Sequence, residues 1–106
     1  KGKVTIAPNP FSPDGDGFED FAIIDYSLPM QVSQLRVKVF DVKGRLVRTL
    51  ANNMPSGSKG QIIFNGLNDN GERLRIGIYI VYLEALDSSG GTVETVKSTV
   101  VVATKL

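Results

Sequence analysis

Short stretches of alternating apolar and polar residues, separated by turn residues, run through most of this sequence. Successive side chains of a β-strand point to opposite faces, so a period of two predicts strands with one buried face. No segment keeps apolar residues at helical spacing for more than two turns. The pattern predicts strands at residues 4–6, 21–28, 35–39, 46–50, 61–65, 78–86 and 93–102.

Turn residues separate the predicted strands. Residues 41–44 (DVKG) predict a hairpin turn, because the glycine can adopt the left-handed conformation. Residues 68–71 (NDNG) and 87–91 (DSSGG) predict two more turns, and the composition of residues 52–60 (NNMPSGSKG) predicts a loop. About seven short strands in 106 residues predict an all-β fold, an antiparallel β-sandwich. An up-and-down barrel is the competing architecture.

The alternation also predicts which side chains face the core. The expected inner faces consist of Ile24, Tyr26, Leu28, Leu35, Val37, Val39, Ile62, Phe64, Tyr79, Val81, Leu83, Val96, Val100 and Val102. The segment 78–86 is unusual because its outward positions, Ile78, Ile80 and Tyr82, are also apolar. Either a loop covers this outer face, or the face is an exposed patch that docks a neighbouring domain or a partner.

The residue types exclude several kinds of chemistry. The chain has no His and no Cys, so it lacks the commonest general base, the usual triad partner and thiolate nucleophiles. Twelve Lys and Arg against eleven Asp and Glu give a net charge of +1, which is too small to attract nucleic acid strongly. No apolar run approaches the ~20 residues of a membrane span. We therefore expect no enzymatic activity, no nucleic-acid partner and no membrane span.

The one cluster of residues whose chemistry indicates a site is acidic. Four of the eleven acidic residues lie within residues 14–20 (DGDGFED). The two glycines allow the backbone to curl so that Asp14 and Asp16 converge, and oxygen ligands at this spacing suit Ca²⁺. The expected ligands are the side chains of Asp14, Asp16 and Asp20 with the carbonyl of Phe18, and Glu19 as an optional addition. The alternative is a solvated turn without metal, because Asp-Gly also forms turns readily.

Three blocks of the sequence are similar to one known family. They are residues 8–28 (PNPFSPDGDGFEDFAIIDYSL), 37–50 (VKVFDVKGRLVRTL) and 62–83 (IIFNGLNDNGERLRIGIYIVYL). Together they resemble the Ig-like domain family of flagellar hook-capping proteins. They also resemble related C-terminal domains of secreted bacterial proteins, including type IX secretion sorting domains. The chain departs from this family at Phe64, where the family usually has Trp.

The resemblance implies an immunoglobulin-like β-sandwich formed by residues 1–106 as one domain, the C-terminal part of a larger protein. It implies a non-catalytic accessory domain of an exported or cell-surface bacterial protein, acting as a secretion or anchoring signal or as a spacer. The partner would be a neighbouring domain of the same chain or the secretion machinery, and the location would be secreted or cell-surface. The oligomeric state is left open.

Two alternative functions remain at this stage. One is a Ca²⁺-stabilised module that binds carbohydrate or protein, and the other is a scaffold domain of the hook-cap type. Carbohydrate binding would draw on aromatic residues outside the predicted core, namely Phe11, Phe18, Phe40 and Tyr82.

Overall fold

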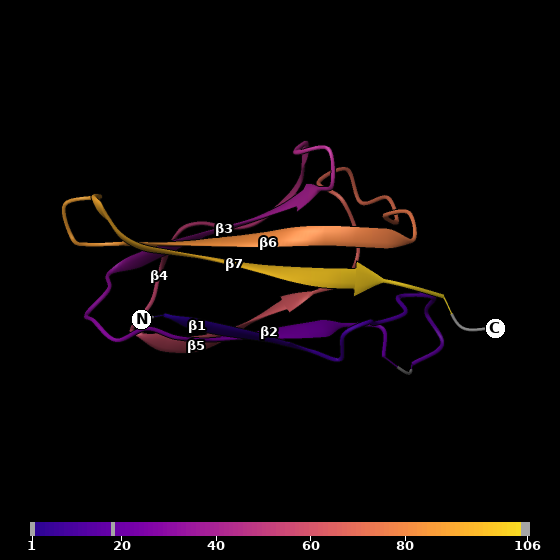
Figure 1. Cartoon of the computed structure of the whole chain (residues 1–106), viewed down its shortest axis with the longest axis horizontal. Helices are drawn as coiled ribbons and strands as arrows, with labels where there is room; N and C mark the ends of the chain where they lie inside the picture. Colours follow the sequence, from indigo (N-terminus) through magenta and orange to yellow (C-terminus); the bar gives the residue numbers. More distant parts are fainter. Residues whose placement is uncertain (1, 18, 105–106) are drawn as a thin grey trace.

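The computed structural model describes residues 2–17 and 19–104, which form two stacked antiparallel sheets (Figure 1). The three-stranded sheet has the order β1 (Lys3–Ala7), β2 (Ala22–Ser27), β5 (Lys59–Phe64). The four-stranded sheet has the order β4 (Leu46–Pro55), β3 (Gln34–Asp41), β6 (Gly77–Leu86), β7 (Thr92–Val102). The antiparallel β-sandwich of about seven strands is thereby confirmed, and the barrel alternative is wrong.

The predicted loop at residues 52–60 is too long, because only residues 56–58 lie outside strands. β4 continues through this region to Pro55, and its last residues pair with β3, Leu35 opposite Met54. β5 then begins at Lys59. Two features accommodate the turn-forming residues: the β3–β4 register shifts three times, and Asn53 adopts a positive φ of 54°. Such bulges let a strand contain residues whose composition indicates a loop.

Three turns have the same structure and the same sequence pattern, which is Asp or Asn followed by any two residues and then Gly. In the β3–β4 hairpin, the Asp41 carboxylate accepts hydrogen bonds from the backbone N–H groups of Lys43 and Arg45, each at 2.9 Å. The turns that begin at Asn68 and Asp87 repeat this pattern. The glycine at the fourth position has a positive φ of 84°, 80° and 89° in the three turns. The side chain of the first residue thus provides the hydrogen-bond acceptor for the backbone N–H groups of the turn.

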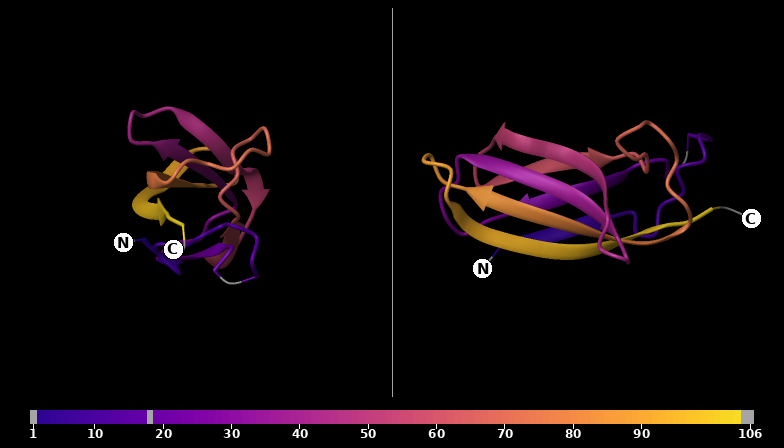
Figure 2. Two further views of the ribbon diagram at one scale, coloured as in Figure 1. Left: turned by 90° about the vertical axis from the view of Figure 1, so that its right-hand side faces the viewer. Right: turned by 90° about the horizontal axis from the view of Figure 1, so that it is seen from above.

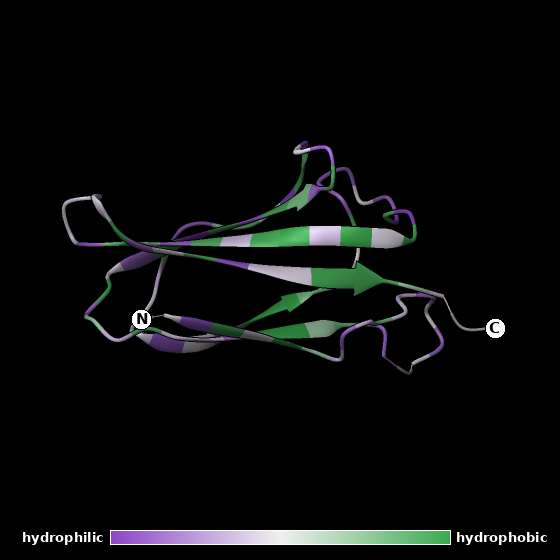
Figure 3. Ribbon diagram, viewed as in Figure 1, coloured by the Kyte–Doolittle hydropathy of each residue, from purple (hydrophilic) through white to green (hydrophobic). Residues whose placement is uncertain are grey.

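The core lies between the two sheets, and Figure 3 shows apolar residues along β2, β6 and the second half of β7. Thirteen of the fourteen side chains predicted to face inward are buried, and Val96 is half-buried against the same cluster. The domain is elongated, 46 × 23 × 19 Å (Figure 2). The alternation of the strands therefore predicted the core correctly.

The expectation for Phe11 is wrong, because the sequence predicts this residue outside the core and it is fully buried. It lies in the connection between β1 and β2, where no alternation exists to indicate its orientation. Its N–H donates to the carbonyl of Val101 at 3.0 Å, and its ring centroid lies 5.5 Å from that of Phe64. Phe11 therefore closes one end of the sandwich.

Candidate functional sites

The acidic loop, residues 12–20, connects β1 and β2. One carboxylate oxygen from each of Asp14, Asp16 and Asp20 lies within 4.8 Å of the other two. The predicted convergence of these three side chains is therefore present. Glu19 is exposed and does not belong to the group, and Phe18, the expected carbonyl ligand, lies outside the described residues.

Hydrogen bonds within the loop explain the position of Asp20. Its carboxylate accepts from the N–H groups of Gly15 at 3.0 Å and Gly17 at 2.7 Å. Both glycines have positive φ values, 77° and 82°, which glycine adopts at no steric cost. The N–H of Ser12 also donates to the carbonyl of Glu19 at 2.9 Å. The loop can therefore form as a turn by itself, and its three carboxylates still offer oxygen ligands of the type that Ca²⁺ prefers.

The blocks that carry the family resemblance meet in space. Gly66, two residues after the buried Phe64, has a φ of 76°, and a Cβ at this position would lie 2.6 Å from Cγ of Pro13. The same position faces the ring of Phe11. The Phe-Asn-Gly step and the Pro-Asn-Pro-Phe segment are thus one packing unit, in which glycine is required for close approach. The role of these residues is to build the fold.

Asn9 binds the outer edge of β7. Its side-chain amide donates to the carbonyl of Thr99 at 3.0 Å, and its side-chain oxygen accepts from the N–H of Val101 at 2.9 Å. At the other end of β7, the N–H of Gly2 donates to the Glu94 carboxylate at 2.6 Å. The N-terminal segment therefore covers polar backbone groups of an edge strand, which would otherwise be open to pairing with another chain.

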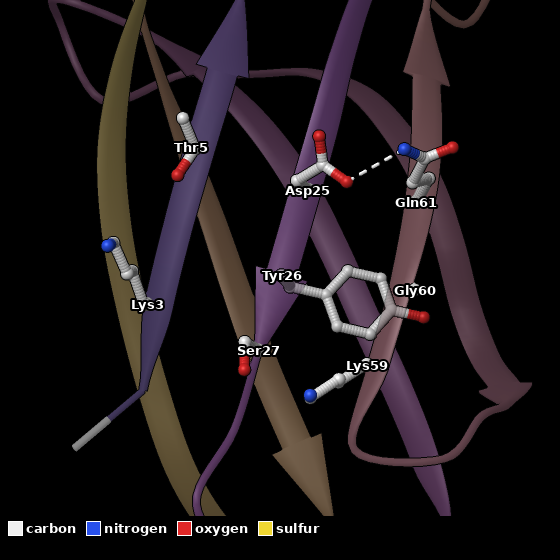
Figure 4. A pocket seen from close by; sticks show the side chains of 8 residues that line it. All are labelled: Lys3, Thr5, Asp25, Tyr26, Ser27, Lys59, Gly60 and Gln61. Atoms are coloured by element: carbon white, nitrogen blue, oxygen red, sulfur yellow. Dashed lines mark hydrogen bonds between the residues drawn. The ribbon is translucent and has the colours of Figure 1, made fainter.

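The outer face of the three-stranded sheet is apolar beside the acidic loop, where Phe21, Ile23 and Ile63 are exposed, and polar toward its other end. Figure 4 shows a shallow hollow on it where the amide of Gln61 donates to Asp25 at 2.8 Å, with Lys3 and Lys59 nearby. Beneath it, the hydroxyl of the buried Tyr26 lies 2.7 Å from that of Ser56. These groups form a solvated sheet surface, and their arrangement does not pair a nucleophile with a base.

The outer face of the four-stranded sheet is apolar at its centre. Phe40, Ile80 and Tyr82 are half-buried, and Ile78 is 51% exposed. The rings of Phe40 and Tyr82 lie 6.4 Å apart and nearly perpendicular, so they do not form a flat platform for a sugar. Lys97 places its ammonium 5.9 Å from the centre of the Tyr82 ring. Gly44 of the hairpin turn borders this face, where it lines a hollow with Phe40, Ile80, Tyr82 and Lys97.

Fold and surface together define an all-β, immunoglobulin-like sandwich without a deep cleft among its described residues. The CHU_C type IX secretion signal domain model matches residues 5–102, and the chain belongs to this family. No curated protein is significantly similar in sequence. No helix in the described part of the chain could cross a bilayer.

Among solved structures, the chain resembles truncated FlgD from Helicobacter pylori. The TM-score is 0.58 at 18% sequence identity, and the match covers 92% of this chain and 65% of that one. The match thus leaves about a third of that truncated chain uncovered. A likeness at this level of identity shows a shared fold. The resemblance noted in the sequence, to type IX secretion domains and to the hook-capping fold, is confirmed.

Proposed function

We propose that this domain is the non-catalytic C-terminal signal by which a larger bacterial protein is exported through a type IX system to the cell surface. The family match carries the proposal, since it extends from β1 to the last residue of β7 and so includes both sheets. The absence of His and Cys from the sequence is consistent with a domain that performs no reaction. Its partners would be the preceding domain of the same chain and the secretion machinery.

The test is a fusion of residues 1–106 to the C-terminal end of a fluorescent reporter that has its own secretory leader. The fusion is produced in a bacterium with a type IX system, and reporter at the surface and in the medium is measured. We expect export that is lost in a strain without the system and in the reporter without the domain. A fusion that remains in the periplasm at the level of the bare reporter would contradict the proposal.

We also propose that the acidic loop binds Ca²⁺ and that the ion stabilises the folded domain. The mutual distances of at most 4.8 Å between carboxylate oxygens of Asp14, Asp16 and Asp20 favour this second function. Three carboxylates this close repel one another, and a divalent cation among them would offset the repulsion. Binding to the folded state alone stabilises by about 2.7 kcal/mol when Ca²⁺ is in hundredfold excess over Kd.

The measurement is the melting temperature in chelator and in millimolar Ca²⁺. We expect Ca²⁺ to raise the melting temperature of the natural chain and of Asp25→Ala, which removes an acid within β2 and outside the loop, but not that of Asp16→Ala. A melting temperature that Ca²⁺ leaves unchanged in all three proteins would show that the loop is a turn only.

A further inference from the structure

We propose that the secretion machinery recognises this domain through the outer patch. The patch is formed on the four-stranded sheet by Phe40, Ile78, Ile80 and Tyr82 with Lys38 and Lys97. The recognising surface is then apolar at its centre and carries carboxylates at its rim. This inference rests on the proposed function and adds to it the surface and the chemistry of the partner.

The apolar part of the patch is continuous across neighbouring strands. Phe40 of β3 pairs with Ile80 of β6, and Ile78 of β6 pairs with the half-buried Val101 of β7. Phe40, Ile80 and Tyr82 line a hollow of about 420 Å³ together with Gly44 and Lys97. A partner side chain can enter this hollow. Contiguous apolar surface of this kind, partly open to water and bordered by charges, is typical of interaction sites.

The charges of the patch are predominantly positive. Lys38 and Lys97 are the register partners of Tyr82 on its two sides. Further along the sheet, Arg36 and Glu84 form an ion pair at 3.3 Å and offset each other. The two lysines therefore leave the patch with a positive rim. A partner with carboxylates at its own rim is complementary to these lysines, whereas a partner with a positive rim would be repelled.

The same charges argue against a second copy as the occupant. Two copies that packed patch against patch would face each other with lysines. The other broad face has exposed apolar residues, Phe21, Ile23 and Ile63, beside the acidic loop. A copy could dock its patch there, but such a contact is heterologous and would continue from copy to copy into a ring or an open filament. We therefore assign the patch to a different protein.

The experiment uses the export fusion with paired variants on the two faces. The patch variants are Ile78→Thr with Ile80→Thr, and Lys38→Glu with Lys97→Glu. The matched controls are Ile23→Thr with Ile63→Thr, and Lys3→Glu with Lys59→Glu, on the three-stranded sheet. Threonine keeps the β-branched shape that strands favour. Each purified domain is first checked for a melting temperature within about 3 °C of the natural one, which limits the stability change to under about 1 kcal/mol.

We expect each patch variant to lower export by about tenfold, the effect of losing one central contact, and the controls to export normally. Undiminished export of the patch variants, with the natural fusion exported, overturns this inference and leaves the proposed function standing. Equal loss in patch and control variants also overturns it. If the natural fusion itself is not exported, the proposed function fails and this inference fails with it.

A second copy remains a distinguishable outcome. Sedimentation velocity of the purified domain is expected to show a monomer at concentrations up to about 100 μM, which corresponds to a dissociation constant weaker than that value. Self-association that Lys38→Glu with Lys97→Glu abolishes would assign the patch to a copy of this chain and overturn the assignment to the machinery.

Discussion

Replacement of Phe64 by alanine tests the central packing of the sandwich. Phe64 is fully buried, and its ring lies 5.5 Å from that of Phe11 at an interplanar angle of 58°. Truncation leaves a cavity that the two sheets cannot close, and Phe→Ala substitutions of this kind cost about 3–5 kcal/mol. Domains of this size are stable by only about 5–15 kcal/mol, so the loss is a large fraction of the total.

The assay is equilibrium unfolding in urea followed by far-ultraviolet circular dichroism. With a slope of about 2 kcal/mol per molar urea, the midpoint of Phe64→Ala falls by about 2 M. Phe21→Ala is the matched control, because Phe21 directly precedes β2 of the same sheet and is 56% exposed. We expect the control to lose less than about 1 kcal/mol.

The ring pair can be measured separately with Phe11→Ala and the double variant. The coupling energy of a tilted aromatic pair is about 0.5–1.5 kcal/mol beyond the burial of each ring. If Phe64→Ala loses under about 1 kcal/mol, or no more than Phe21→Ala, the side chain does not fill the core as described and the reasoning is refuted.

Three further predictions follow from local contacts. Gly60→Ala lowers the melting temperature, because a Cβ there would collide with the ring of Tyr26; a temperature equal to that of the natural chain contradicts this. Hydrogen bonds, chiefly from the Arg45 N–H and the Ser89 hydroxyl respectively, lower the pKa values of Asp41 and Asp87 from the ordinary 3.8. The contribution of these two carboxylates to folding stability is present above that value and is lost as the pH falls through the lowered pKa. Thermal scans from pH 7 to pH 2 should therefore show that the melting temperature falls less with acid for Asp41→Asn with Asp87→Asn than for the natural chain. Parallel plots of melting temperature against pH for the two proteins would exclude the effect. Asn9→Ala uncovers the edge of β7; faster aggregation on light scattering is expected, and an unchanged rate would argue against the covering role.

The fold was predictable because its information is local. Strand alternation gave the inner faces of both sheets, and the Asp- or Asn-led turns marked where hairpins reverse. Residues 52–55 were missed because their strand character comes from pairing with β3 and not from their own composition. Phe11 was missed for a related reason, since a connecting segment has no period and its burial depends on Phe64 and β7.

The candidate site was predictable only in outline. Two glycines between aspartates indicate a curled backbone, and three carboxylates do converge. The donors to Asp20, by contrast, are backbone N–H groups whose direction depends on the left-handed conformation of both glycines. Charge on the outer patch was equally hidden, because the contact of Lys97 with Tyr82 requires the β6–β7 register.

The contacts of Asn9 have a consequence for the order in which the sandwich can close. Asn9 is separated from Val101 by 92 positions, the same separation as between Gly2 and Glu94. A polypeptide that emerges from the ribosome, or crosses a membrane, from its N-terminal end offers these first residues no partner until nearly all of it has arrived. Contacts so distant along the chain form slowly because the connecting loop must be ordered first. A deletion that removes Val101 would then also remove hydrogen bonds of Asn9 and Phe11, at the opposite end of the sequence.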